Sequence, residues 1–269
     1  MRITYLGTAA AEGFPALFCN CEYCREAKRL GGKNIRTRSQ SMINENLLID
    51  FPQDSYMHFL REGIDGHKIE YVLFTHVHRD HFYISDLSNR QAPYAHAMDV
   101  KTLKIFCPST VYDAFDKVPE NVELTRLEPY KTVSIGEYRI TPLPAKHAYG
   151  TEAFIYIIDG DKTLLYAHDT GYFYDEVFEY IKSHGVKLDM ISLDCTNVDI
   201  PISDDGVHMG FPNIKRVLER LCEIGAVSEK TIKYVNHFSH NGNPLHEIME
   251  KKARTVGCLV SYDGCCVEI

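Results

Sequence analysis

The chain alternates short apolar runs with polar turn segments, and most of the apolar runs are typical of β-strands. Residues 46–52 and 71–76 are rich in Leu, Ile, Val and Phe without strict alternation, which is the pattern of strands covered on both faces. An Asp-Gly pair at 159–160 interrupts a longer apolar stretch and predicts a tight hairpin. Further strands are expected within residues 2–8, 102–108, 122–129, 137–147, 154–169, 189–195 and 231–242.

Two segments have the three- and four-residue spacing of amphipathic helices. Residues 211–225 carry four apolar side chains on one face, followed by a glycine suited to a C-cap: Ile214, Val217, Leu218, Leu221 and Gly225. Residues 174–185 repeat the pattern with Val177, Phe178, Ile181 and a final Gly185. We expect both helices to pack outside two sheets, within one domain that spans residues 1–269.

The composition is that of an ordinary globular protein, with 45% hydrophobic and 25% charged residues. The 269 residues can bury a large core, and no apolar run is long enough to span a bilayer. The first residues lack the apolar region of a signal peptide, so we expect a cytoplasmic protein without a membrane partner. The formal net charge is −8 with no basic block, which argues against a nucleic-acid partner.

The strongest chemical signal follows an apolar run that ends at Phe74. His76, His78, Asp80 and His81 lie within six residues directly after it. Imidazoles and carboxylates bind divalent metals, and four of them in one short loop can serve two ions. An exposed polar loop with coincidental histidines is the alternative, and the position directly after a buried strand argues against it.

Three later apolar runs also end in a histidine or an aspartate, namely His147, Asp169 and His237. Because functional groups gather beyond the carboxyl ends of strands in open α/β sheets, we expect these side chains to complete two metal sites. His168 stands beside Asp169, but adjacent residues of a strand point to opposite faces. We therefore expect His168 to support the site or lie on the surface and not to bind metal.

This order of motifs resembles the metallo-β-lactamase-fold hydrolases over essentially the whole chain. The resemblance implies an α/β fold, the αββα sandwich of two mixed β-sheets flanked by helices. It assigns the metal ligands in three parts: His76, His78 and His147 to one ion, Asp80, His81 and His237 to a second, and Asp169 as the bridge. So few carboxylates leave a pair of Mn²⁺ or Zn²⁺ ions enough positive charge to acidify a water between them.

Three thiols, Cys19, Cys21 and Cys24, lie within six residues and lack a fourth partner. His240 is left over, three residues after one of the expected ligands. Together these four side chains make a Cys₃His set, which is typical of a closed structural zinc site, in an insert at about residues 15–35. A Cys21–Cys24 disulfide or a redox-active pair is the competing interpretation, and a third thiol and a cytoplasmic setting disfavour it.

The cysteine segment and the histidines of residues 237–240 resemble the branch of phosphoribosyl cyclic phosphodiesterases of phosphonate metabolism. This resemblance implies hydrolysis of a small cyclic phosphodiester, such as 5-phosphoribosyl 1,2-cyclic phosphate or a cyclic nucleotide, by in-line attack of a hydroxide held between two metal ions. It favours Mn²⁺ slightly and suggests a homodimer. The alternatives are a ribonuclease of the tRNA-maturation type, a lactonase or other acyl hydrolase, a mono-iron persulfide oxygenase, and a non-catalytic metal-binding relative of the pyrroloquinoline quinone biosynthesis type.

The expected catalytic groups are His208, Asp80 and Asp169. His208 lies in a polar loop before a predicted helix, and the resemblance places a histidine of this segment against the substrate, where it would protonate the leaving group. A helix-entry histidine with local contacts only is the alternative. Asp194 ends a predicted strand, and we expect it to hydrogen-bond a ligand histidine.

Three basic residues that follow the cysteine segment are candidates for contacting a second phosphate of the substrate. They are Lys33, Arg36 and Arg38. Exposed basic residues are more often plain solvated surface, so the sequence leaves both interpretations open.

Overall fold

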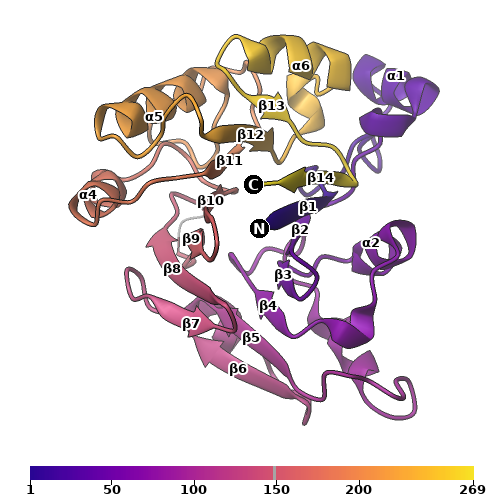
Figure 1. Cartoon of the computed structure of the whole chain (residues 1–269). Helices are drawn as coiled ribbons and strands as arrows, with labels where there is room; N and C mark the ends of the chain where they lie inside the picture. Colours follow the sequence, from indigo (N-terminus) through magenta and orange to yellow (C-terminus); the bar gives the residue numbers. More distant parts are fainter. Residues whose placement is uncertain (148–149) are drawn as a thin grey trace.

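The computed structural model describes residues 1–147 and 150–269, and within these residues two seven-stranded sheets face each other (Figure 1). The first sheet comprises, in spatial order, β14 (Cys265–Glu268), β1 (Arg2–Gly7), β2 (Gln40–Ile43), β3 (Leu47–Ile49), β4 (Tyr71–Leu73), β5 (Leu103–Cys107) and β6 (Val122–Arg126). The second comprises β13 (Leu259–Val260), β12 (Ile232–Asn236), β11 (Met190–Asp194), β10 (Thr163–Ala167), β9 (Phe154–Asp159), β8 (Tyr138–Pro144) and β7 (Val133–Ile135).

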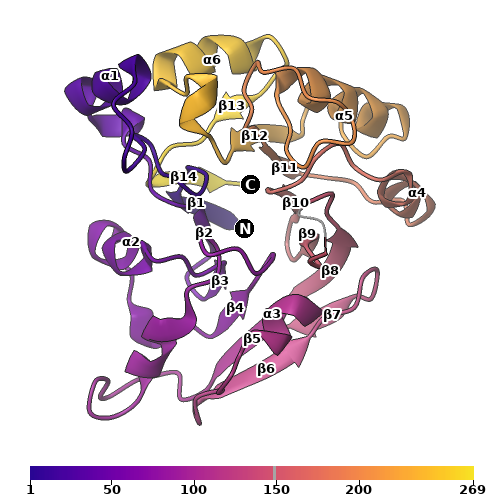
Figure 2. The same cartoon turned by 180° about the vertical axis from the view of Figure 1, so that it is seen from behind.

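Helices cover the outer faces of both sheets, as the two opposite views show (Figures 1 and 2). Those beside the second sheet are α4 (Asp175–Ser183), α5 (Phe211–Glu223) and α6 (His246–Arg254). The first sheet is flanked by α2 (Ser55–Glu62) and α3 (Ser109–Asp113), and α1 (Glu22–Leu30) belongs to the cysteine segment. The short 3₁₀ turns are η1 (Gly32–Asn34), η2 (Gly66–Lys68), η3 (Ile84–Arg90) and η4 (His240–Gly242). The predicted αββα sandwich of two mixed sheets is confirmed.

Apolar side chains fill the space between the sheets and the space under the helices. Ile3 and Leu73 of the first sheet pack with Ile140, Ile158 and Leu164 of the second in one buried cluster. The strands read as continuous apolar runs because most are covered on both faces, by the opposite sheet and by a helix or loop.

The two predicted helices are confirmed, and all of their predicted apolar positions are buried. Gly185 and Gly225 follow α4 and α5 with φ of 61° and 72°, the left-handed conformation in which glycine ends a helix without a steric penalty. The predicted hairpin is also present, since β9 and β10 pair antiparallel with Asp159 opposite Thr163.

The two termini lie side by side (Figure 1) because β1 pairs antiparallel with β14. Among the described residues, no helix has both the length and the apolar character that crossing a membrane requires. All nine cysteines are free thiols. Four of the six outside the cysteine segment are buried, as expected for small apolar side chains, whereas Cys222 and Cys266 are exposed.

Candidate metal centre

The predicted ligands meet where strands of both sheets end. β3, β4 and β5 run parallel in the first sheet, and β10, β11 and β12 run parallel in the second. The carboxyl ends of parallel strands share one edge of a sheet, so residues that are far apart in the sequence converge there. The loop after β4 supplies four ligands, and the ends of β8, β10 and β12 supply His147, Asp169 and His237.

The first group of ligand atoms belongs to His76, His78 and His147. One ligand nitrogen from each of the three lies within 4.8 Å of the other two. The distance from His147 Nε2 to His78 Nδ1 is 3.0 Å. Burial lowers the pKa of both His76 and His147, which favours the neutral imidazole that a metal ion requires. These three histidines come together as predicted.

The second group belongs to Asp80, His81 and His237, whose ligand atoms also lie within 4.8 Å of one another. All three side chains are buried. His237 has a φ of 63°, a left-handed conformation that is costly for a residue with a Cβ and that clusters at functional sites. It turns the chain directly after β12, so that the imidazole faces the other ligands.

Asp169 joins the two groups. Its Oδ2 lies 3.0 Å from His81 Nε2 and 3.0 Å from His237 Nε2, and its Oδ1 lies 3.7 Å from His147 Nε2. Asp169 also has a positive φ, 51°. A carboxylate in this position can contact ions held on either side of it.

The convergent atoms fit a site for divalent metal. His76 Nε2, His81 Nε2, His237 Nε2 and Asp169 Oδ2 are buried and have no hydrogen-bond partner among the described residues. Burying polar atoms without partners costs free energy, and four such atoms facing one another constitute a ligand cage. Nitrogen and carboxylate donors of this kind suit Zn²⁺, Mn²⁺ or Fe²⁺.

Asp50 supports the second group and was missed in the sequence analysis. It follows β3, has a φ of 64° and is fully buried. His81 donates from Nδ1 to Asp50 Oδ2 over 2.7 Å, so its Nε2 faces the cage. Thr75 donates its backbone N–H and its hydroxyl to the same carboxylate. Asp50 ends an apolar run just as Asp169 does, so the strand-end signal was present in the sequence.

Asp50→Asn should weaken metal binding by about 10–100-fold, because the hydrogen-bonded carboxylate orients His81 and raises its basicity. Competition with a chromogenic chelator measures this affinity. Asp65→Asn is the matched control, since Asp65 is exposed and paired with Lys68, and it should bind metal like the wild type. Wild-type affinity in the Asp50 variant would show that this carboxylate only stabilises the fold.

Asp194 has a different direct partner from the one predicted. His208 donates from Nδ1 to Asp194 Oδ2 over 2.9 Å, whereas the ligand His237 is 3.8 Å away. Thr196 connects them, because its hydroxyl donates to Asp194 over 3.1 Å and lies 2.8 Å from His237 Nδ1. The prediction of a direct bond to a ligand histidine is therefore wrong, and the contact runs through a hydroxyl.

His208 faces the metal-ligand groups. Its Nδ1 is 3.9 Å from Asp169 Oδ1, and its ring centre is 4.8 Å from that of His147. Burial acts to lower the pKa of His208, but the carboxylates of Asp194, Asp169 and Asp80 raise it to about 9. The alternative of purely local contacts at a helix entry does not describe this histidine.

His168 points away from the cage, as expected. It is buried, and its Nε2 lies 2.7 Å from Ser192 Oγ. Its ring packs against Tyr166, with 3.9 Å between ring centres. Burial lowers its pKa well below the ordinary value, so it is a neutral residue of the interior beneath the site.

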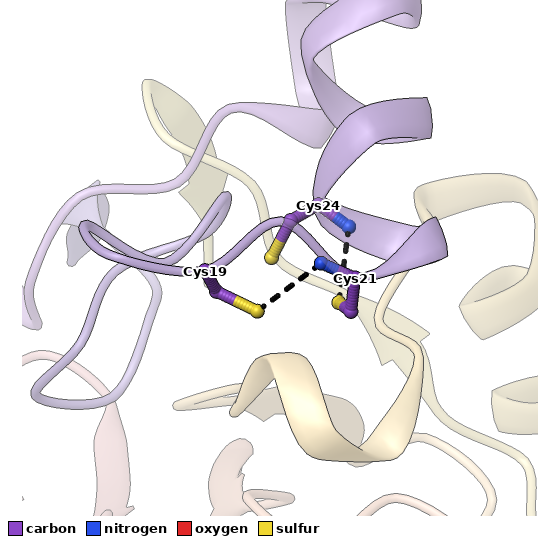
Figure 3. A group of neighbouring side chains, drawn as sticks. All are labelled: Cys19, Cys21 and Cys24. Carbon is purple, nitrogen blue, oxygen red and sulfur yellow. Dashed lines mark hydrogen bonds between the residues drawn. The ribbon is translucent and has the colours of Figure 1, made fainter.

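The three thiols of the N-terminal segment cluster as predicted (Figure 3). Their sulfur atoms lie within 4.8 Å of one another. Cys21 donates its backbone N–H to Cys19 Sγ, and Cys24 donates its own to Cys21 Sγ, over 3.4 and 3.5 Å. Backbone donors of this kind stabilise thiolates, the form in which cysteine binds metal. The competing disulfide is absent.

His240 lies outside the group formed by the three sulfurs. Its backbone N–H donates to Glu12 Oε1 over 3.2 Å, and its Nδ1 is 3.3 Å from the same oxygen. The Nδ1 atom is buried without a hydrogen bond among the described residues. The cysteine cluster thus has the donor chemistry of a zinc site, and His240 as its fourth ligand stays a prediction.

Arg36 fits neither of the two interpretations that the sequence left open, because it lies in the interior and not on a solvated surface. Its side chain is fully buried, with the guanidinium 4.5 Å from the centre of the Phe238 ring. It donates to Thr8 Oγ1 and to the carbonyl of Ser261 over 2.9 and 2.7 Å. Burial lowers its pKa to about 10. Its role is to hold the turn that follows His237.

The other two basic candidates have local partners. Arg38 pairs with Asp54 over 3.1 Å and donates to the carbonyl of Ala11. Lys33 Nζ lies 4.2 Å from the centre of the Tyr262 ring. For both residues, the choice between contact with a substrate and plain solvated surface stays open.

Comparisons with known proteins agree with this geometry. The model of the β-lactamase superfamily domain matches residues 46–238. The structure is similar to that of a diphosphatase from the PhnP family, with 22% identity and a TM-score of 0.73 over 99% of this chain and 97% of that one. It also resembles the metallo-β-lactamase-fold protein YhfI from Bacillus subtilis (18%, 0.70, 99% of each chain) and Zn²⁺-bound PqqB from Methylobacterium extorquens (15%, 0.71, 100% of each chain). Among curated proteins, none matches.

Proposed function

Because the chain belongs to the β-lactamase superfamily, we propose that it is a metal-dependent hydrolase of small phosphodiesters. The observation that carries this proposal is the position of Asp169, which lies within 3.0 Å of His81 and His237 and 3.7 Å of His147. One carboxylate between two groups of ligands supports a dinuclear centre. Two bound ions would supply an acidified water and neutralise charge on the phosphate oxygens.

The protein side chains supply the remaining chemistry. A phosphodiester that is attacked at phosphorus releases an alkoxide, which needs a proton. His208 faces the ligand groups and is held by Asp194, which also accepts the backbone N–H groups of Thr196 and Met209, each over 3.0 Å. This fixed carboxylate orients the imidazole and favours its protonated form, so His208 is the donor to the leaving oxygen.

The substrate we favour is 5-phosphoribosyl 1,2-cyclic phosphate or a similar cyclic phosphate. Its support is the presence of a three-cysteine cluster in addition to the histidine and aspartate groups, and the similarity of the whole chain to a PhnP-family diphosphatase. Mn²⁺ or Zn²⁺ at the centre and Zn²⁺ at the cysteines are part of the proposal. The net charge of −8 weighs against an RNA substrate, whose phosphates favour basic surfaces.

The test is hydrolysis by protein that has been reconstituted with Mn²⁺ or with Zn²⁺. The panel contains 5-phosphoribosyl 1,2-cyclic phosphate, 2′,3′-cyclic nucleotides, bis(p-nitrophenyl) phosphate, a lactone and a precursor tRNA. Cleavage of the cyclic phosphates with the highest kcat/KM supports the proposal. Preference for the lactone or the RNA would replace it with acyl or RNA hydrolysis, and no turnover despite full metal loading would indicate a non-catalytic relative.

The kcat of the wild type should fall as the pH rises through the pKa of His208, because a general acid acts in its protonated form. Asp194 raises that pKa, so Asp194→Asn should move the alkaline limb to lower pH. Bound cations lower the pKa of His208, in opposition to the carboxylates. The measurement is therefore the shift of the alkaline limb between the pH profiles of the variant and the wild type. Superimposed alkaline limbs would contradict the coupling of Asp194 to the acid.

A further inference from the structure

A polar cavity of about 500 Å³ opens beside the metal centre. His147 forms part of its wall and also belongs to the first group of metal ligands. Val207, directly before His208, forms another part, and its carbonyl lies 3.2 Å from His147 Nδ1. The cavity therefore adjoins both the metal ligands and the proposed acid.

The wall of the cavity is fixed to the segment that carries Asp169. Lys146 donates its backbone N–H to Thr170 Oγ1 over 3.0 Å, and its carbonyl accepts from the N–H of Gly171 over 2.9 Å. A Cβ on Gly171 would lie 1.8 Å from the carbonyl oxygen of Gly206, so only glycine allows the loop before His208 to approach this closely. The position of Lys146 relative to the metal centre is thus set by the backbone.

Lys146 brings a positive charge to this cavity. Its Nζ donates to the carbonyl of Asp204 over 2.8 Å and lies 5.0 Å from the centre of the Tyr174 ring. An ammonium carries three donors, and the described contacts engage one of them. The Asp204 carboxylate is bound by Arg216 over 2.6 and 2.8 Å, while Asp205 is exposed at the rim.

We propose that this cavity holds the alcohol part of the substrate and that Lys146 binds a second phosphate group on it. This inference rests on the proposed function. A general acid must lie next to the leaving oxygen, so a leaving group protonated by His208 lies beside the 203–209 loop, which forms one wall of the cavity. An ammonium group whose N–H donors are not all engaged can bind phosphate, and it does so as a point charge.

Two matched pairs of substrates test the inference in the metal-loaded protein. The first pair is ribose 1,2-cyclic phosphate with and without a 5-phosphate. The second pair is cytidine 2′,3′-cyclic phosphate with and without a 5′-phosphate. The wild type should prefer the 5-phosphorylated member of a pair by about tenfold or more in kcat/KM, mainly through KM, because a charge-assisted contact made in the bound state is uniform binding. Equal kcat/KM within both pairs would overturn the inference while leaving the proposed function intact. No turnover of any of the four would overturn both.

Lys146→Gln should abolish most of that preference, and Lys146→Arg should retain it. Lys187→Gln is the matched control, because Lys187 also donates to a backbone carbonyl, that of Gly225 over 2.7 Å, but lines a different cavity. It should keep the wild-type preference. If Lys146→Gln lowered both members of a pair equally, the lysine would only brace the loop through Asp204. A third outcome is that the enzyme prefers both cytidine substrates over both ribose substrates. If Tyr174→Leu removed that preference and Lys146→Gln changed nothing, the cavity would recognise a base and not a phosphate.

Discussion

Asp169→Ala should lose the ability to hold two ions at once, with kcat/KM falling by at least about 10³-fold. Asp169 and Asp80 are the only carboxylates in the predicted ligand set. Asp169 lies between the two groups, 3.0 Å from His81 and from His237 in the second and 3.7 Å from His147 in the first. Without it, five neutral imidazoles and one carboxylate would face a combined charge of two divalent ions. The mutual repulsion of the ions would then be offset by a single negative charge.

Metal content per chain, measured on Asp169→Ala after dialysis, reports this loss directly. Asp169→Asn separates charge from shape, because it keeps the side-chain volume and should also fail to retain the pair. Asp113→Ala provides the control for a lost surface carboxylate, since Asp113 is exposed and pairs with Arg126. Full occupancy of both active-site ions in Asp169→Ala would refute the bridging role, whatever the activity.

The metal ligands were predictable from the sequence because they obey one simple rule. Each ligand or ligand-bearing loop comes directly after an apolar run, and parallel strands end at a common edge. This rule places His147 and His237 beside His76 without knowledge of the loops between them. Two sheets with helices outside them followed from the same runs, because strands covered on both faces need a layer on each side. The αββα sandwich itself was implied by the resemblance to the metallo-β-lactamase-fold hydrolases.

Residues whose role depends on a distant partner were not predictable. Arg36 has the appearance of a surface residue in the sequence, yet it is buried because Phe238 and the carbonyl of Ser261, more than 200 positions away, form its surroundings. The partner of Asp194 was misassigned for a similar reason, since Thr196 occupies the place between it and His237. A hydroxyl that connects two side chains, or a buried arginine, produces no hydrophobic periodicity by which the sequence could reveal it.

Asp50 is a different case, because its signal was present and overlooked. An aspartate before Phe51 and Pro52 reads as a turn residue, and no histidine accompanies it. Its contact with His81 over 2.7 Å depends on β3 and β4 being parallel neighbours, which the sequence did not establish.

His208→Ala should lower kcat by about 10²–10⁴-fold, the range for loss of a general acid, while both metal ions remain bound. His208 belongs to neither of the two predicted ligand groups, but it faces them through a ring centre 4.8 Å from that of His147. His184→Ala should behave as the wild type, since His184 is exposed and bonded within its own helix to the carbonyl of Tyr180. Metal analysis of both variants distinguishes a lost acid from a damaged centre.

The leaving group decides whether His208 acts as an acid or only shapes the pocket. A sugar alkoxide needs a proton to depart, whereas p-nitrophenolate is stable without one. The defect of His208→Ala should therefore be large for a ribose cyclic phosphate and small for bis(p-nitrophenyl) phosphate. An equal defect for both substrates would remove the proton-transfer role, because a pocket-shaping residue acts regardless of leaving-group basicity. Asp194→Asn should show the same selectivity in weaker form, since it disorients the imidazole without deleting it.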